Sequence, residues 1–148
     1  MENWIWGLSL IALTMAIHGV GILWIALADA RIRVRIEGTR RLRWRHLLEF
    51  NVGVISVLGL LLAALHGIEA AVWAAAYWWL GALNSPADAL LYSIDSISTR
   101  GASDLMLERH WRLMGSLEAV DGMLLFGIST AFVFTVMQAY WPLLIRRR

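Results

Sequence analysis

The chain has 148 residues, of which 59% are hydrophobic, with nine Trp and no Cys. A small soluble domain could not bury so many apolar side chains, so the composition indicates a membrane protein. The absence of Cys excludes disulfides, thiolate metal sites and thiol redox chemistry. All 13 basic residues are Arg, and their clustering says more about orientation than the net charge of +2 does.

The first predicted element is a transmembrane helix within residues 1–30. Trp4 to Leu27 holds no charge across 24 residues. At the helical rise this makes about 36 Å, which exceeds the roughly 30 Å hydrocarbon core. The segment has neither the basic n-region nor the short apolar run of a signal peptide.

Residues 31–47 are predicted to form an Arg-rich cytoplasmic loop. Seven of the 13 Arg lie between Arg31 and Arg45, and three more close the chain in a basic tail at 143–148. Arg-rich segments beside membrane spans remain cytoplasmic and contact anionic lipids. We therefore expect this loop to set topology and to face lipid, rather than to bind nucleic acid or a regulator.

Two further apolar regions lie at 48–83 and 112–141, joined by a segment too short to cross a membrane. With both Arg clusters in the cytoplasm, three spans place the N-terminus outside and the C-terminus inside. The short segment then enters the membrane from the outside.

A short helix is predicted over 86–98. Ser85 supplies an N-cap, Pro86 the first helical position and Asp88 a carboxylate at the third, which together are typical of a helix start. After this helix the chain passes through a tight, Gly-containing turn.

The stretch from Ala89 to Asp104, ALLYSIDSISTRGASD, resembles the pore loop of bacterial potassium channels, in which a helix of this length leads into Thr-Val-Gly-Tyr-Gly-Asp. The resemblance runs from about Leu62 to Gln138. It includes the inner-helix sequence GSLEAVDGMLLFGISTAFVF, which is similar to small bacterial proteins of the two-transmembrane-pore ion channel family. On the outer helix it includes His66, Glu69, Trp73 and Tyr77.

This resemblance implies an all-α membrane protein of three transmembrane helices with a re-entrant pore helix and filter loop between the second and third. The pore module, 48–142, would comprise an outer helix at 48–83, the pore helix at 86–98, the filter at 99–104 and an inner helix at 112–141. Irregular chain at membrane depth must be enclosed, and four copies around an axis enclose it, so we expect a homotetramer. The expected location is the bacterial cytoplasmic (inner) membrane.

The predicted filter comprises Thr99, Arg100, Gly101, Ala102, Ser103 and Asp104. Three of these six residues differ from the family, namely Arg100, Ala102 and Ser103. Arg100 stands where the family has Val or Leu, and an unpaired guanidinium inside a membrane costs on the order of 3 kcal/mol. We expect Arg100 to pair with Asp95, behind the filter, and with Asp104. The alternative turns Arg100 toward the axis as a ring of four positive charges. Ala102 and Ser103 loosen the turn, so a tight potassium filter is not expected.

Further candidates on the inner helix are Glu118, Asp121, Gly122, Ser129 and Thr130. Glu118 matches the family and is expected to anchor the inner helix to the pore loop. Asp121 would pair with Arg100 or join a ring of acids lining the cavity. Gly122 permits close packing or a hinge. Ser129 and Thr130 either line the cavity or bond back to helix carbonyls.

His66 and Glu69 lie one helical turn apart in the second span, a pair compatible with a metal ligand set or a proton relay. His18 in the first span is the residue that could approach them. Two ligands do not make a site. We therefore expect a buried His–Glu hydrogen bond that joins helices, with no metal and no cofactor.

These observations favour a potassium-channel-like tetrameric pore whose degenerate filter passes monovalent ions with weak selectivity or none. One alternative is a non-conducting membrane protein that retains the channel architecture, and another is a small metal or proton transporter. Nothing in the sequence resembles a nucleophile with its base, a phosphate loop or a zinc motif, so no enzymatic activity is expected.

Overall fold

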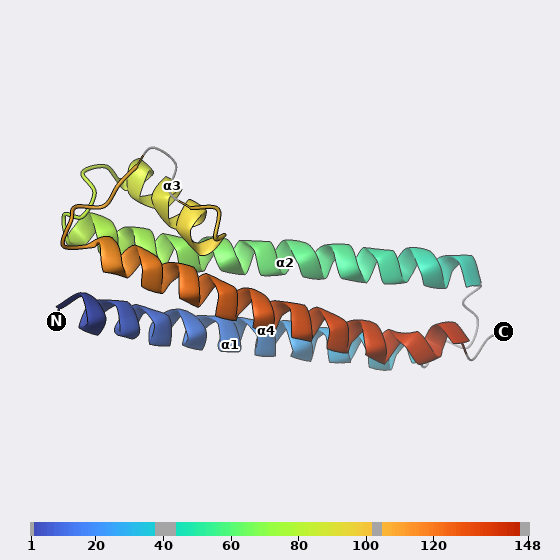
Figure 1. Cartoon of the computed structure of the whole chain (residues 1–148). Coiled ribbons are helices and arrows are strands. Elements are labelled where there is room, and N and C mark those ends of the chain that lie inside the picture. Colours follow the sequence, from blue (N-terminus) through green and yellow to red (C-terminus); the bar gives the residue numbers. More distant parts are fainter. Residues whose placement is uncertain (1, 38–43, 102–104, 146–148) are drawn as a thin grey trace.

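The computed structural model of the chain describes residues 2–37, 44–101 and 105–145, with side chains described over 2–35, 49–101 and 105–141. These residues form four α-helices (Figure 1). Their bounds are α1 (Glu2–Glu37), α2 (Trp44–Trp79), α3 (Pro86–Ile97) and α4 (Arg112–Ile145).

Three of the described helices are long and apolar enough to cross a membrane, over Glu2–Arg35, Glu49–Trp79 and Arg112–Trp141. The described part of the chain is therefore all-α and has the composition of a multi-pass membrane protein. This agrees with the three spans expected from the sequence.

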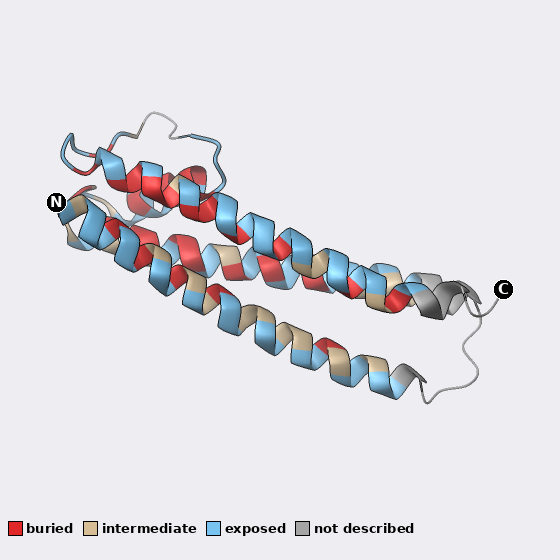
Figure 2. Cartoon of the chain, turned by 60° about the horizontal axis from the view of Figure 1, so that its bottom comes forward, coloured by how far each residue is buried: buried red, intermediate tan, exposed pale blue. Residues whose placement is uncertain are grey.

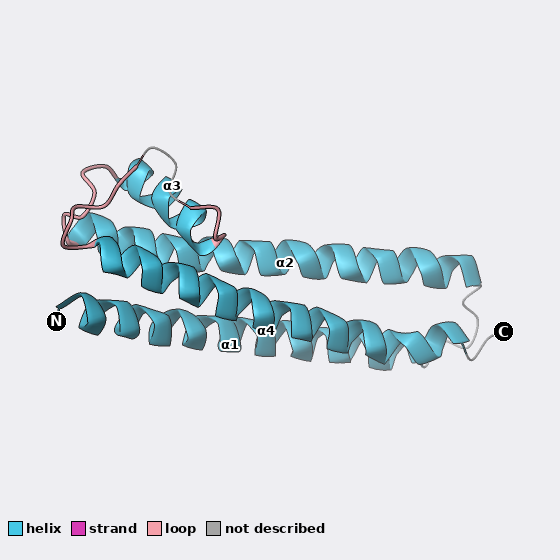
Figure 3. Cartoon of the chain, in the orientation of Figure 1, coloured by secondary structure: helices cyan, strands magenta, loops and turns pink. Residues whose placement is uncertain are grey.

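The three long helices lie side by side, with α2 antiparallel to α1 and α4 (Figures 1 and 3). The N-terminal end of α1, the C-terminal end of α2 and the start of α4 share one end of the bundle. The short helix α3 packs against α2 and α4 at this same end. The described chain begins and finishes at opposite ends of the bundle, as an odd number of crossings requires.

The long helices extend farther into the Arg-rich region than the sequence indicates. The predicted loop over 31–47 is helical up to Glu37 and again from Trp44. Arg is a strong helix former, and no Gly or Pro lies between Leu27 and Gly38. The sequence therefore contains no helix-breaking residue before Gly38. At its other end α4 likewise continues past 141, to Ile145.

Helix α2 ends at Trp79 rather than at 83 because Gly81 takes a φ of +68°. The N–H of Gly81 donates to Trp78 O at 3.1 Å, and the N–H of Ala82 donates to Tyr77 O at 2.9 Å. This pair of bonds is a Schellman motif, in which a glycine suits the left-handed position.

Helix α3 starts as predicted and ends in an unusual way. The Ser85 side chain accepts from the Asp88 N–H at 3.4 Å, and Pro86 is in the first turn. At the other end, Thr99 N–H donates to Ser96 O at 2.9 Å and Arg100 N–H to Asp95 O at 3.0 Å. The motif is the one that closes α2, but Thr99, with a φ of +57°, takes the glycine position. A β-branched residue there is strained, at a cost of about 1–3 kcal/mol.

Buried residues concentrate at the end of the bundle that holds α3 (Figure 2). Their main cluster is rich in aromatic rings, which come from α2, α3 and the turn before α4: Trp73, Tyr77, Tyr92 and Trp111. A smaller cluster of Ala70, Ile97 and Leu125 joins the C-terminal end of α3 to α2 and α4. The end of the bundle that carries α3 is therefore the better packed.

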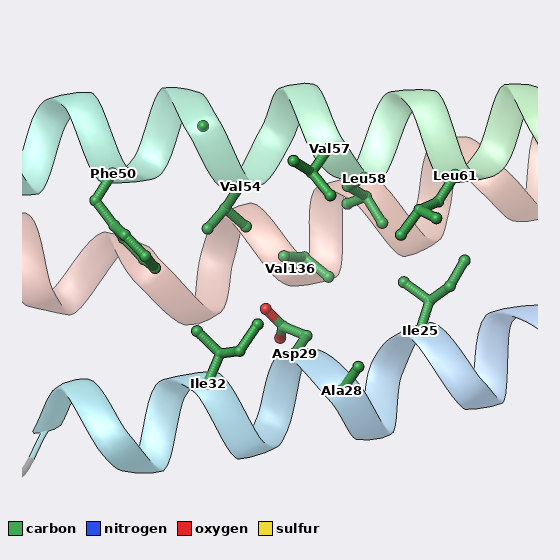
Figure 4. Close-up of a pocket in the computed structure, with 11 residues that line it drawn as sticks. Ile25, Ala28, Asp29, Ile32, Phe50, Val54, Val57, Leu58, Leu61 and Val136 are labelled. Carbon is green, nitrogen blue, oxygen red and sulfur yellow. The ribbon is translucent and has the colours of Figure 1, made fainter.

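Toward the Arg-rich end, α1 and α2 leave a groove of about 360 Å³ between them (Figure 4). Its lining is apolar apart from Asp29, which projects from α1. Asp29 accepts from the Tyr140 hydroxyl at 2.6 Å and lies 2.9 Å from Arg33 Nε. The carboxylate is thus held within the protein, and the rest of the groove presents hydrocarbon.

Candidate functional site

Glu118 on α4 joins the short helix α3 to the bundle. Its carboxyl group accepts from the Tyr77 hydroxyl of α2 at 2.8 Å and contacts the Ser93 hydroxyl of α3. Ser93 Oγ also lies 2.7 Å from Ala70 O, and Ser96 donates to Gly115 O at 3.0 Å. The expected contact between Glu118 and the short helix is confirmed, and it belongs to a buried network across three helices.

Gly122 lets α3 and α4 approach backbone to backbone. A Cβ placed on Gly122 would lie 2.0 Å from Ile97 O, far inside contact distance. Close packing, one of the two roles expected for this residue, is therefore confirmed. By contrast, a Cβ on Gly127 would meet nothing within 4 Å among the described residues.

The turn after α3 carries the predicted ion pair. Arg100 Nη1 lies 2.9 Å from Asp95 Oδ1, and the Asp95 side chain is only 2% exposed while that of Arg100 is 71% exposed. The contact between Arg100 and Asp95 is confirmed. The second expected partner, Asp104, lies outside the described residues together with Ala102 and Ser103, so that half of the network stays a prediction.

The same turn exposes irregular backbone. Residues 98–101 are non-helical and exposed, and Gly101 has a φ of +83°. They directly follow Ile97, which packs against α4 beside Gly122. The turn thus lies well inside the bundle's length rather than at its rim.

Asp121 faces α1 and α2, which differs from both roles expected for it. Its Oδ2 lies 2.6 Å from Thr14 Oγ1 and accepts from Trp73 Nε1 at 3.0 Å. The side chain is fully buried in the single chain, so it cannot line a cavity between copies. Its partners are Thr14 and Trp73, whereas Arg100 pairs with Asp95.

Near the middle of the long helices, His18 joins His66 and Glu69. His18 Nδ1 lies 2.7 Å from Glu69 Oε1, and His66 Nδ1 lies 3.0 Å from Glu69 Oε2. Ser129 Oγ lies 3.2 Å from Nε2 of each histidine. The buried His–Glu hydrogen bond that joins helices is confirmed. The histidine that makes it is His18 of α1, whereas His66 lies on the same helix as Glu69.

The two hydroxyl residues of α4 behave differently. Ser129 belongs to the histidine cluster, where its hydroxyl group meets both imidazole rings instead of a carbonyl group of its own helix. Thr130 is exposed and donates to Phe126 O at 2.8 Å, as expected for a hydroxyl that bonds back to its helix.

Sequence reasoning did not identify Thr14 as part of the site. Thr14 and His18 are four residues apart on α1, as are Glu69 and Trp73 on α2, so each pair shares one helix face. This four-residue spacing could have indicated from the sequence that Thr14 lies beside His18. It shows which residues share a helix face, but not which neighbouring helix that face contacts.

Comparison with known proteins assigns no family: no protein-family model matches the chain, and no curated protein or solved structure matches it significantly.

Proposed function

We propose that the chain forms a potassium-channel-like homotetrameric pore for monovalent ions, with weak selectivity or none, in the bacterial cytoplasmic membrane. The N-terminus would lie outside and the C-terminus inside. In this proposal α2 is the outer helix, α3 a re-entrant pore helix, the turn after it the filter and α4 the inner helix.

One observation supports the proposal: an exposed, non-helical turn follows α3 where that helix meets α4 well away from the end of the bundle. Ile97 meets α4 at Gly122, ten residues into that helix, which corresponds to about 15 Å, or half of the roughly 30 Å hydrocarbon core. Non-helical chain is tolerated at that depth only where protein buries it or water lines it. The exposed turn at 98–101 therefore needs water or a second copy of the chain beside it.

A pore supplies both water and neighbouring copies of the chain beside the turn. Four copies around an axis enclose the four turns and place them against water. The C-terminal end of α3, which carries the partial negative charge of the helix dipole, lies at the same depth and favours a cation. The pairing of Arg100 with buried Asp95 supports a side chain held behind the filter rather than on the axis.

The exposed guanidinium of Arg100 favours a second candidate, a non-conducting protein that keeps the channel architecture. A side chain that is 71% exposed beside the turn could close the pore in an assembly. A metal or proton transporter built on His18, His66 and Glu69 remains the third alternative, and uptake of metal or protons into vesicles would distinguish it.

Cysteine accessibility tests the carrying observation, because the natural chain has no Cys. Ser98→Cys, in the exposed turn, should react with a small water-soluble thiol reagent in intact membranes. The control Ile68→Cys lies on α2 at similar depth, 55% exposed on the apolar surface, and should not react. Equal protection of both positions would show that the turn is dry and would contradict the pore.

Assembly is the second test. A detergent-corrected mass should give four chains per particle, since closure around an axis is what covers the turns. A monomer or dimer that is stable across detergents would contradict the pore.

A further inference from the structure

Three side chains of metal-ligand type converge where α1 crosses α2. His18 comes from α1, and His66 and Glu69 come from α2. One ligand atom from each lies within 4.8 Å of the other two. Their side chains are 1%, 13% and 0% exposed, respectively. Two imidazoles and one carboxylate form a ligand set used by zinc, with a fourth position left open.

Two buried atoms of this cluster lack a hydrogen bond within the described chain: Glu69 Oε2 and His66 Nδ1. They are 3.0 Å apart, yet the imidazole N–H direction does not point at the oxygen. A shared metal ion accounts for this offset, because with bonds of roughly 2.1 Å each ligand points about 45° away from the line between the two atoms. Buried polar atoms without partners are rare and call for such an explanation.

The position of Ser129 fits a metal on the opposite side of both rings. If both Nδ1 atoms bind metal, both Nε2 atoms carry hydrogen, and the two lone pairs of the Ser129 hydroxyl accept them at 3.2 Å. If instead both neutral rings carry hydrogen on Nδ1, both Nε2 atoms need a donor. The single hydroxyl hydrogen of Ser129 can satisfy only one of them.

We propose that His18, His66 and Glu69 bind one divalent first-row transition-metal ion, of the Zn²⁺ class, per chain. Imidazole and carboxylate ligands suit this class. On binding, a neutral His18 that carries its hydrogen on Nδ1 exchanges it for a hydrogen on Nε2, and the freed Nδ1 lone pair goes to the metal.

A groove reaches the edge of the cluster on the Ser129 side. This groove of about 430 Å³ lies between α2 and α4, and His66, Ser129 and Thr130 are among its lining residues. The His66 ring stacks on Phe126 at its edge, with 4.5 Å between centroids. A bound ion would fasten α1 to α2, a role that does not depend on whether the assembly conducts.

Metal titration of the purified full-length protein tests the proposal. After chelator treatment in detergent, Zn²⁺ measured by calorimetry should bind at one ion per chain, and Co²⁺ should give the visible absorption of a tetrahedral site. His66→Ala should weaken Zn²⁺ binding by at least about 100-fold. His110→Ala is the matched control, since His110 is 62% exposed and lies outside the cluster, and it should bind as the unmutated chain does.

If His66→Ala fails to fold, the unmutated protein still decides the question: Zn²⁺ should raise its melting temperature, and chelator should reverse the rise. No Co²⁺ spectrum and no Zn²⁺ stabilisation would overturn the proposal and leave a proton as the cluster's cation. Equal binding by His66→Ala and the unmutated chain would overturn it as well. Neither readout requires ion flux, so failure here is separate from failure of the proposed pore.

Discussion

Glu118 of α4 reaches α2 and α3, whereas Asp121, one helical turn later, reaches α1 and α2. The α3 side is closed by direct backbone contact at Gly122 and by hydroxyl groups that meet Glu118. The α1 side is joined by side chains and keeps buried atoms without hydrogen bonds among the described residues, namely Asp121 Oδ1, Glu69 Oε2 and His66 Nδ1.

The contrast teaches that α1 and α3, two of the three helices that contact α4, are held to it in different ways. Backbone contact fixes α3 at one depth, which a filter-forming turn requires. An incompletely paired polar interface leaves room for a cation or for adjustment between α1 and the remaining helices.

The largest expected effect follows from Glu118→Ala. The Tyr77 hydroxyl would be left buried without its acceptor, whereas Ser93 would keep Ala70 O, so we expect a loss of about 2–3 kcal/mol of unfolding free energy. Hydrogen exchange should rise in α3 and stay unchanged in α1. Asp121→Ala is the mirror variant and should raise exchange in α1 while leaving α3 protected. If both variants loosened the same helix, the contrast between α1 and α3 would be wrong.

Gly122→Ala should come next in size. The added methyl group would overlap Ile97 O, and overpacking of this kind costs about 1–3 kcal/mol. Gly127→Ala, on the same helix with free space around it, should instead leave stability unchanged or raise it by up to about 1 kcal/mol. Denaturation of the assembled protein in graded detergent measures both. Equal effects at the two glycines would remove the backbone contact from the account.

The ion pair in the turn should have the smallest effect on stability. Arg100→Val leaves the buried Asp95 carboxylate without this partner, and Asp95→Val in addition should recover part of the loss. Because the guanidinium is mostly exposed, we expect a coupling of about 1 kcal/mol in the double-mutant cycle. Coupling below roughly 0.5 kcal/mol would mean that Arg100 acts independently of Asp95, as a residue facing the axis would.

Local patterns predicted the local structure well. The Ser85 cap and Pro86 place the start of α3, and the five-residue separation of Asp95 and Arg100 across a helix end brings their side chains together. The partner of Asp121 could not be predicted this way. Its angular position on α4 follows from the sequence, but which helix lies there depends on how α1 packs, and no local spacing encodes that.

The histidine cluster shows the same limit. His66 and Glu69 are visible as a pair and His18 is a candidate neighbour, but only the structure shows that His18, 51 positions away from Glu69 on another helix, contacts it. Likewise, Arg propensity extends α1 to Glu37, where a charge-based reading ends the span earlier. Interactions between helices, not within them, are what the sequence left open.

Ion flux tests the central claim most directly. Purified protein in vesicles, with KCl on one side and NaCl on the other, should carry current with a reversal potential close to zero, because the altered filter discriminates little between the two cations. Replacing part of the salt on one side with an impermeant solute should shift the potential in the direction of cation permeation. Absence of any current above empty vesicles, in a preparation shown to be tetrameric, would contradict the pore, and a chloride-selective current would contradict an Arg100 held behind the filter.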